Sequence, residues 1–267
     1  MQPLDAQQNA SRDQFDRRAA AYGKSHILSD TSDIARAQQW FQATTGMALL
    51  DVACGGGHCG LFFGKAGLTI TLGDLAPAML ERAAALFAEA HLSVETQLHP
   101  AEIFPYPNES FDRVTCRVAA HHFTNVPAFL RECRRVLKSE GRLLIIDGSV
   151  EDDAPAAYAW SHAVEKLRDP SHGCFLTPHQ WTSTCMEAGF HVVHHDLQPF
   201  LMPDLEWYFD AAATPAENRE KVRQLVAAAP QEVRRLFSIK EDAETDRITW
   251  QWQRLTLVAT ACFALKV

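Results

Sequence analysis

The chain has 267 residues, 47% of them hydrophobic, and a formal net charge of −8 at pH 7. This length and composition allow one large domain with a sizeable core and a modest cap. The acidic balance argues against a nucleic-acid partner, because binding to phosphate backbones needs clustered Lys and Arg. The sequence contains no run of about 18 uncharged apolar residues, so we expect no membrane span. Its polar start also lacks the apolar core of a secretory signal. We therefore expect a cytoplasmic protein.

The seven cysteines do not follow a metal-binding pattern. None occurs as C-x-x-C, and Cys54 and Cys59 lie five residues apart across a glycine-rich turn. A structural zinc site needs four well-spaced ligands, which this spacing does not supply. We expect reduced thiols, most of them buried, and no bound metal.

The first 46 residues predict two helices ahead of the main fold. Between Ser11 and Tyr22 the apolar residues fall on one helical face. Asp33 is a suitable N-cap for a second helix that continues to about Ala43.

Between residues 47 and 150, short apolar runs alternate with amphipathic helical patterns. Strands separated by crossover helices in this way predict a doubly wound, mostly parallel α/β sheet. The expected strands are 47–54, 68–74, 93–99, 111–119 and 142–149. The expected helices are one that follows the three glycines 55–57 and runs to about Lys65, and two more over 77–88 and 126–138.

After Val150 the alternation becomes less regular. The expected elements are a helix ended by Pro170, a helix over 178–189, a sixth strand over 190–197 and short helices within 204–238.

The last residues alternate like a strand, but the apolar phase shifts between Trp252 and Leu255, which predicts a bulge or two strand pieces. We expect residues 151–267 to complete a seven-stranded sheet within one structural domain. The insertions 150–176 and 200–245 are expected to form a helical cap, because loops at this edge of such sheets carry specificity.

A glycine-rich loop follows the first strand. Residues 55–60, GGGHCG, match G-x-G-x-x-G between a predicted strand and a predicted helix. Glycines allow a tight turn and close backbone approach, and a helix N-terminus offers free N–H groups. Asp74, at the end of the second strand, can accept hydrogen bonds from two ribose hydroxyls or can serve as a helix cap. These features fit a dinucleotide as well as an adenosine ligand.

Asp51 distinguishes between the two ligands. It lies inside the first strand, four residues before Gly55. Dinucleotide enzymes need no acid there, whereas a ligand with a cationic amino-acid tail can use a carboxylate near the loop. With LLDVACGGG (49–57) and LGDLAPAML (72–80), the chain resembles the class I S-adenosylmethionine-dependent methyltransferases.

The resemblance covers about residues 12–190. AEIFPYPNESFDRVTCRVAAHHF (101–123) and RECRRVLKSEGRLLIID (131–147) are similar to the ubiquinone/menaquinone-biosynthesis methyltransferases, and QFDRRAAAYGKS (14–25) and EKLRDPSH (165–172) also fit that subgroup. It implies transfer of a methyl group from S-adenosylmethionine to a small-molecule acceptor, with S-adenosylhomocysteine as the product.

The resemblance further implies a cofactor site across the carboxyl ends of the first two strands. The main chain around Arg117 and Val118 would face the methionine amino group. Tyr22 could close over the pocket, so that residues 1–46 would cover the cofactor-binding core of residues 47–150. The residues that would hold the methionine portion are Asp51, Ala53, Gly55 and Gly57.

The ribose and adenine would lie along the second strand. Asp74 would hold the ribose, and Leu75 and Met79 would flank the adenine, although Met79 could equally be a core residue. Ala101 would offer its N–H to the base, with Glu102 beside it.

Pro100 departs from the pattern of the family. Relatives usually carry an acid at this position, which binds the adenine amino group. Either Glu102 substitutes, a backbone oxygen suffices, or cofactor affinity is reduced.

Methyl transfer from a sulfonium is an in-line displacement, and positioning of the reactants can supply about 7–11 kcal/mol. A base is needed only for a phenol, an alcohol or an acidic carbon. His121 and His122 follow the fourth strand and are the candidate catalytic bases. Further candidates for the acceptor pocket are Arg117, Asp147, Glu165 and His172.

Two alternatives remain open from the sequence. An NAD(P)-dependent oxidoreductase could use the same glycine loop, although Asp51 and the segment 111–123 count against it. A non-catalytic protein could keep the S-adenosylmethionine pocket, and Pro100 is the feature that suggests this. Fold alone does not decide between them.

Overall fold

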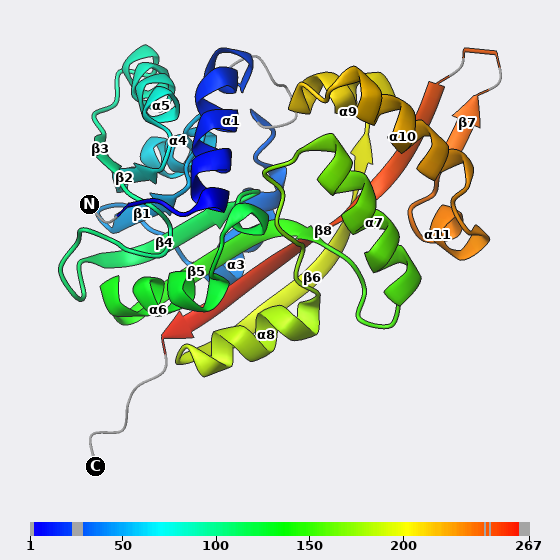
Figure 1. Cartoon of the computed structure of the whole chain (residues 1–267). Coiled ribbons are helices and arrows are strands. Elements are labelled where there is room, and N and C mark those ends of the chain that lie inside the picture. The colour runs from blue at the N-terminus through cyan, green and yellow to red at the C-terminus, as the bar shows by residue number, and fades with distance from the viewer. Residues whose placement is uncertain (1–2, 23–28, 243, 246, 262–267) are drawn as a thin grey trace.

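The computed structural model describes residues 3–22, 29–242, 244–245 and 247–261, and for 20–22 it describes the backbone alone. Its centre is an eight-stranded sheet in the order β3-β2-β1-β4-β5-β8-β6, with the short β7 paired to β8 (Figure 1). The strands are β1 (Ala48–Val52), β2 (Thr69–Asp74), β3 (Glu95–Leu98), β4 (Phe111–Arg117), β5 (Leu137–Ser149), β6 (Phe190–Met202), β7 (Lys240–Asp242) and β8 (Arg247–Ala261).

The sheet is mostly parallel, as predicted. Strands β3, β2, β1, β4 and β5 pair in parallel, and β8 runs antiparallel to β5, β6 and β7. The chain leaves β1 toward β2 on one side and later returns to β4 on the other. This reversal is the feature of doubly wound α/β sheets that creates a ligand crevice outside the strand ends.

Helices cover both faces of the sheet and its extended end (Figure 1). A 3₁₀ turn, η1 (Ala120–His122), follows β4. The described helices are α1 (Ala6–Tyr22), α3 (Ser32–Phe41), α4 (His58–Lys65), α5 (Pro77–Glu89), α6 (Val126–Val136), α7 (Pro155–Arg168), α8 (Pro178–Glu187), α9 (Leu205–Ala212), α10 (Ala216–Ala227) and α11 (Gln231–Leu236). None of them is long and apolar enough to cross a membrane.

The buried side chains of β5 alternate between two cores. Leu143 and Ile145 pack with α6 and α8 on one face, whereas Leu144 and Ile146 pack with α3, α4 and α5 on the other. This period of two is the geometry of a strand buried on both faces. A third apolar core lies among α7, α9, α10 and α11, against the far ends of β6 and β8.

The last strand differs from the prediction of a bulge. β8 pairs residue by residue with β5 from Gln253 to Thr260. Trp250 and Trp252 face the third core, whereas Leu255 begins the set of alternate residues that enters the core beneath α6 and α8. The apolar phase therefore shifts because β8 passes from one core to another. The register shift lies in β6 instead, near Val192.

Three strand boundaries also differ from the predicted ones. β5 begins at Leu137, directly after α6 ends at Val136, so it starts five residues earlier than the predicted strand 142–149. β6 continues to Met202, where it reaches the third core. β3 is shorter than predicted and covers only Glu95–Leu98.

A buried ion-pair cluster fastens α3 to the sheet. The Asp33 carboxylate lies 3.0 Å from Nη2 of Arg117 on β4 and 3.0 Å from Nη1 of Arg254 on β8. Its side chain is only 4% exposed. One carboxylate thus compensates two guanidinium groups that are largely removed from water.

Replacing Asp33 with Asn should lower the free energy of unfolding by about 3–5 kcal/mol, because it leaves two buried cations without their counter-charge. Urea denaturation would measure this change. Asp13→Asn removes an exposed pair with Arg12 and is the matched control, with an expected change below about 1 kcal/mol. Equal losses in both variants would contradict a structural role for the Asp33 cluster.

Candidate active site

A cleft opens at the carboxyl ends of β1, β2 and β4, beside α1. Its empty volume, including the part open to solvent, is about 1010 Å³. The predicted site residues that line it are Asp51, Ala53, Gly55, Asp74, Leu75, Met79, Ala101, Glu102, Arg117, Val118 and His122.

Asp74 holds the glycine loop from the end of β2. One carboxylate oxygen accepts the Gly55 N–H at 2.9 Å, and the other accepts the Ala76 N–H at 2.9 Å. Burial raises the pKa of Asp74, and these amide hydrogen bonds oppose the rise. Each carboxylate oxygen keeps a further lone pair for a ligand.

Asp51 holds the other side of the loop. Its oxygens accept the Thr115 hydroxyl at 2.7 Å and the Gly60 N–H at 2.9 Å. Burial raises the pKa of this carboxyl to about 6, although both hydrogen bonds lower it. Asp51 therefore links β1 to β4 and to the first turn of α4, and it also lines the cleft.

Gly57 lies behind the cleft lining. Its φ of +80° belongs to the left-handed region, where glycine is favoured. A Cβ at this position would lie 2.8 Å from the Cβ of Ala83 on α5. Gly57 thus permits α4 to begin in close contact with α5, and the structure gives it a packing role.

Ala53 and Val118 carry backbone strain at the cleft. They follow β1 and β4, and their φ values are +50° and +55°. A positive φ is uncommon for residues with a Cβ and is most costly for β-branched ones such as Val118. Strained backbone at two neighbouring strand ends is typical of a functional site.

Two buried polar atoms on the cleft have no hydrogen-bond partner among the described residues. They are the Ser11 hydroxyl on α1 and Nε2 of His58 at the start of α4. Buried polar groups are almost always hydrogen-bonded. A polar ligand in the cleft would satisfy both.

Glu102 connects α1 to the loop after η1. Its carboxylate accepts the Gln8 amide at 2.9 Å and the Thr124 N–H at 3.0 Å. Glu102 therefore lines the cleft and also holds α1 beside it. The side chain of Tyr22, predicted to close over the pocket, lies outside the described part of the chain.

The two candidate histidines have different surroundings. His122 lines the cleft, and its Nδ1 lies 3.0 Å from the Ser171 carbonyl. His121 turns away from the lining, and its Nδ1 donates to the Asp147 carboxylate at 2.6 Å. Burial lowers the pKa of His121, but the charge and hydrogen bond of Asp147 outweigh this and raise it overall.

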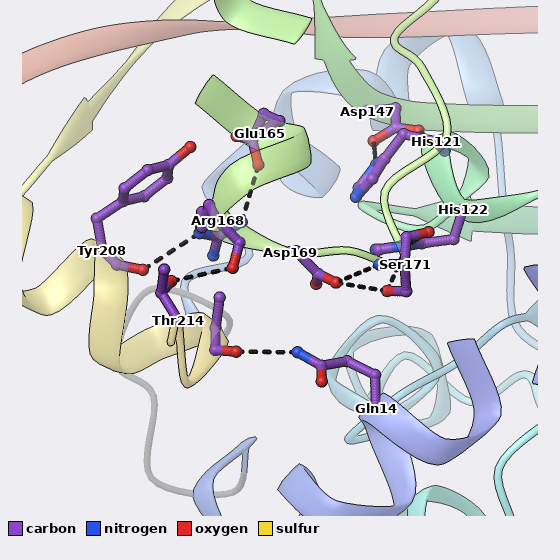
Figure 2. A network of polar contacts seen from close by, with 11 residues as sticks. Gln14, His121, His122, Asp147, Glu165, Arg168, Asp169, Ser171, Tyr208 and Thr214 are labelled. Carbon is purple, nitrogen blue, oxygen red and sulfur yellow. Dashed lines mark hydrogen bonds and ion pairs between the residues drawn. The ribbon is translucent and has the colours of Figure 1, made fainter. Parts of the chain in front are cut away.

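The remaining acceptor-pocket candidates are not part of the described lining of the cleft. Asp147 binds His121, and Glu165 lies 3.0 Å from Nη1 of Arg168 on the same helix, α7 (Figure 2). His172 is 1% exposed, and neither ring nitrogen has a partner in the described structure.

Arg117 lines the cleft, but its guanidinium binds Asp33. The side chain therefore supports α3, and the adjoining main chain remains the part suited to a ligand.

Several lining residues were not predicted. No sequence pattern indicates His99, which packs against Gly73. Phe15 was seen only as part of an apolar helical face. Ser171 and Asp169 lie outside the lining, in the motif at 165–172; Asp169 binds Ser171, and the contact of Ser171 with His122 joins segments about 50 residues apart. Such contacts cannot be read from local spacing. The lining residues in this group are Gln8, Ser11, Arg12, Phe15, Cys54, Gly56, His58, Cys59, Ala76, His99, Ala119 and Phe123.

Known proteins share this arrangement. A family described as "Methyltransferase domain" matches residues 50–145. The uncharacterized methyltransferase YcgJ of Bacillus subtilis is 29% identical over 84% of this chain and 88% of its own length. The YafE protein of Escherichia coli is 31% identical over 63% of this chain and 81% of its own. Ubiquinone biosynthesis O-methyltransferase of Xanthomonas oryzae is 33% identical over 43% of this chain and 47% of its own.

Solved structures agree with the sequence matches. The YcgJ structure superposes with a TM-score of 0.80 at 25% identity, covering 88% of this chain and all of its own. BH2331 of Bacillus halodurans, solved as a candidate methyltransferase, gives a TM-score of 0.81 at 29% identity over 87% of this chain and all of its own.

Gly57→Ala should lower the free energy of unfolding by about 2 kcal/mol or more, because it combines a left-handed backbone with a clash against Ala83. Gly46→Ala is the matched control, since Gly46 has a φ of +86° but open space around a Cβ. Thermal or urea unfolding of both variants would measure the difference. A loss in Gly57→Ala no larger than in Gly46→Ala would rule out the packing role.

Proposed function

Because this chain belongs to the S-adenosylmethionine-dependent methyltransferase family, we propose that the cleft at the ends of β1, β2 and β4 is its cofactor site. When bound, S-adenosylmethionine supplies a methyl group on a positively charged sulfur. The observation that carries the proposal is the Asp74 carboxylate, which lines the cleft and fixes the Gly55 amide next to it. The orphaned polar atoms of Ser11 and His58 fit a polar ligand in the same place.

Different strand ends would hold different parts of the ligand. Asp74 holds the two ribose hydroxyls through its free lone pairs. The backbone of Ala53, Gly55 and Val118, which line the cleft with positive φ values, would lie around the methionine portion. Asp51 keeps this backbone in place through Thr115 and Gly60 and also offers negative charge to the ligand.

The adenine end lies between α5 and the loop after β3. Leu75, Met79 and Ala101 provide apolar contact there. Because Glu102 is engaged by Gln8 and the Thr124 amide, it is poorly placed to replace the acid that Pro100 lacks. A main-chain oxygen would then receive the adenine amino group.

The acceptor is a small molecule held on the side of His122 and the cap. We assign the cap to the insertions 150–176 and 200–245, which contain α7 and α9–α11 and lie together at the extended end of the sheet (Figure 1). The protein's task is alignment of acceptor and methyl group, which can supply about 7–11 kcal/mol without a metal.

A place beside the ubiquinone/menaquinone-biosynthesis methyltransferases is also proposed. Its support is the similarity of residues 101–147 to that subgroup and the relatives of that name matched over 43% of the chain. The names of those relatives assign them to ubiquinone or menaquinone biosynthesis, and the proposal for this chain is limited to a small-molecule acceptor.

Isothermal titration calorimetry tests the cofactor site. S-adenosylmethionine and S-adenosylhomocysteine should bind, and NADH should not. Asp74→Asn should weaken binding of both by about 10- to 100-fold, because a hydrogen bond to a charged group contributes about 1.5–3 kcal/mol.

Asp196→Asn, on the edge strand β6, is the control and should bind like the wild type. Far-UV circular dichroism of each variant would check its fold. Binding of NADH in place of the two sulfur ligands, or unchanged affinity in a folded Asp74→Asn protein, would overturn the assignment.

A further inference from the structure

We propose that His122 accepts the proton of the methyl acceptor, that Ser171 and Asp169 hold it in the required tautomer, and that the acceptor is an aromatic hydroxyl compound. His122 is then a catalytic residue, and Ser171 and Asp169 are positioning residues. This inference rests on the proposed function, because it needs a methyl donor in the adjoining part of the cleft.

The first step is the tautomer of His122. Its Nδ1 lies 3.0 Å from the main-chain oxygen of Ser171. A carbonyl oxygen only accepts, so Nδ1 carries the hydrogen. In a neutral imidazole the lone pair is then on Nε2. Nε2 makes no hydrogen bond with any residue that the structure describes, and the ring lines the cleft.

Asp169 and Ser171 reinforce this tautomer (Figure 2). The Ser171 hydroxyl donates its hydrogen to Asp169 Oδ1 at 2.6 Å, and the Ser171 N–H donates to the same oxygen at 2.9 Å. With its hydrogen committed, the Ser171 oxygen can only accept from Nδ1 of His122, which lies 3.2 Å away. Asp169 and Ser171 are 4% and 2% exposed, so water does not compete for these bonds.

The charge state agrees with a base at rest. Burial and the neighbouring His121 lower the pKa of His122, and Asp169 and the Ser171 carbonyl only partly oppose this. The rings of His121 and His122 are 4.2 Å apart, yet Asp147 raises the pKa of His121. Two neighbouring groups with pKa values moved in opposite directions are the usual sign of an acid–base site. The titratable groups around His122 are His121, Asp147, Glu165, Asp169 and His172, with Arg12 and Glu102 also on the cleft.

The aromatic surroundings indicate the class of acceptor. The Phe15 ring meets the His122 ring edge to face, with centroids 4.9 Å apart and planes at 89°. Phe123 lines the same cleft. An aromatic ring packs well against such groups, and a hydroxyl on that ring needs a base, whereas an amine or a thiolate does not.

The step balances as follows. The acceptor's O–H bond breaks and its proton forms a bond to Nε2 of His122, while the oxygen forms a bond to the methyl carbon. The electron pair of the carbon–sulfur bond stays on sulfur, so the positive charge moves from sulfur to the imidazole. His122 returns to the neutral form by releasing the proton to solvent.

The first test is ¹⁵N NMR of protein labelled at histidine, with S-adenosylhomocysteine bound. The His122→Gln variant lacks the signals of the His122 ring, and this loss identifies them in the wild-type spectrum. Wild type should show a protonated Nδ1 and an unprotonated Nε2 at neutral pH. The Asp169→Ala substitution removes the acceptor of the Ser171 hydroxyl, which can then donate to Nδ1 of His122. The ¹⁵N signals should therefore move toward the tautomer that carries its hydrogen on Nε2. The double variant Asp169→Ala/Ser171→Ala lacks that hydroxyl and should recover the wild-type pattern.

The second test is turnover of phenol, catechol and 4-methylcatechol, with thiophenol and aniline as acceptors that need no base. Chromatography would measure S-adenosylhomocysteine release. The phenols should be methylated, and His122→Gln should reduce their kcat by about 10²- to 10⁴-fold. His195→Gln, at an exposed position on β6, is the control and should retain full activity.

The pH profile separates positioning from structure. Activity on a phenol should fall in acid as His122 becomes protonated. The Asp169 carboxylate raises the pKa of His122, so Asp169→Ala should move this acid limb to lower pH and also reduce kcat. A purely structural role for Asp169 would leave the position of the limb unchanged.

The outcomes distinguish this inference from the cofactor assignment. If calorimetry detects no binding of S-adenosylhomocysteine to the protein, the proposed function itself fails. If the ligand binds but His122 carries its hydrogen on Nε2, or if only thiophenol or aniline or none of the acceptors is methylated, this inference alone is overturned.

Discussion

Two buried carboxylates at the ends of neighbouring parallel strands hold the glycine loop in its shape. Asp51 accepts the Gly60 amide and Asp74 accepts the Gly55 amide, each at 2.9 Å. Burial raises the pKa of both acids, and the amide bonds oppose that cost. Without them, backbone N–H groups next to the cleft would lose partners, at about 1–3 kcal/mol each. The start of α4 and the mouth of the cleft depend on this arrangement.

Helix α1 extends the same organisation from the cofactor side to the cap. Asp16 accepts the Ala78 amide at the start of α5, at 3.1 Å. Two residues earlier, the Gln14 side chain donates to the Ala212 carbonyl at the end of α9, at 2.9 Å (Figure 2). One helix thus contacts both α5, which borders the proposed adenine end, and α9, which belongs to the proposed cap. Movement of α1 would change both sides of the cleft together.

The sequence predicts what short spacing encodes. The first strand, the glycine loop and the first crossover helix follow each other within residues 47–65, and the second strand ends at Asp74. The sequence alone therefore predicts where the loop and Asp74 lie in the fold. The bridge from Asp33 to Arg254 joins residues 221 positions apart, and no local pattern signals it. The phase shift near Trp252 was visible but was interpreted as a bulge, because a strand that passes between two cores gives the same pattern. Glu102 was expected beside the adenine, and its hydrogen bonds to α1 were not foreseen.

The proposed donor site and the loop that holds His122 come from different stretches of the chain. The family match ends at residue 145 and contains every strand end that faces the proposed donor. Asp169 and Ser171 lie beyond it, in the loop after α7, and reach His122 from outside the matched segment. A methyl donor is common to many acceptors, so its site can stay constant while the loop after α7 changes. The contact between His122 and that loop is therefore where the proposed donor site meets the proposed acceptor side, and substitutions in the loop after α7 should affect acceptor choice more than substitutions in the glycine loop do.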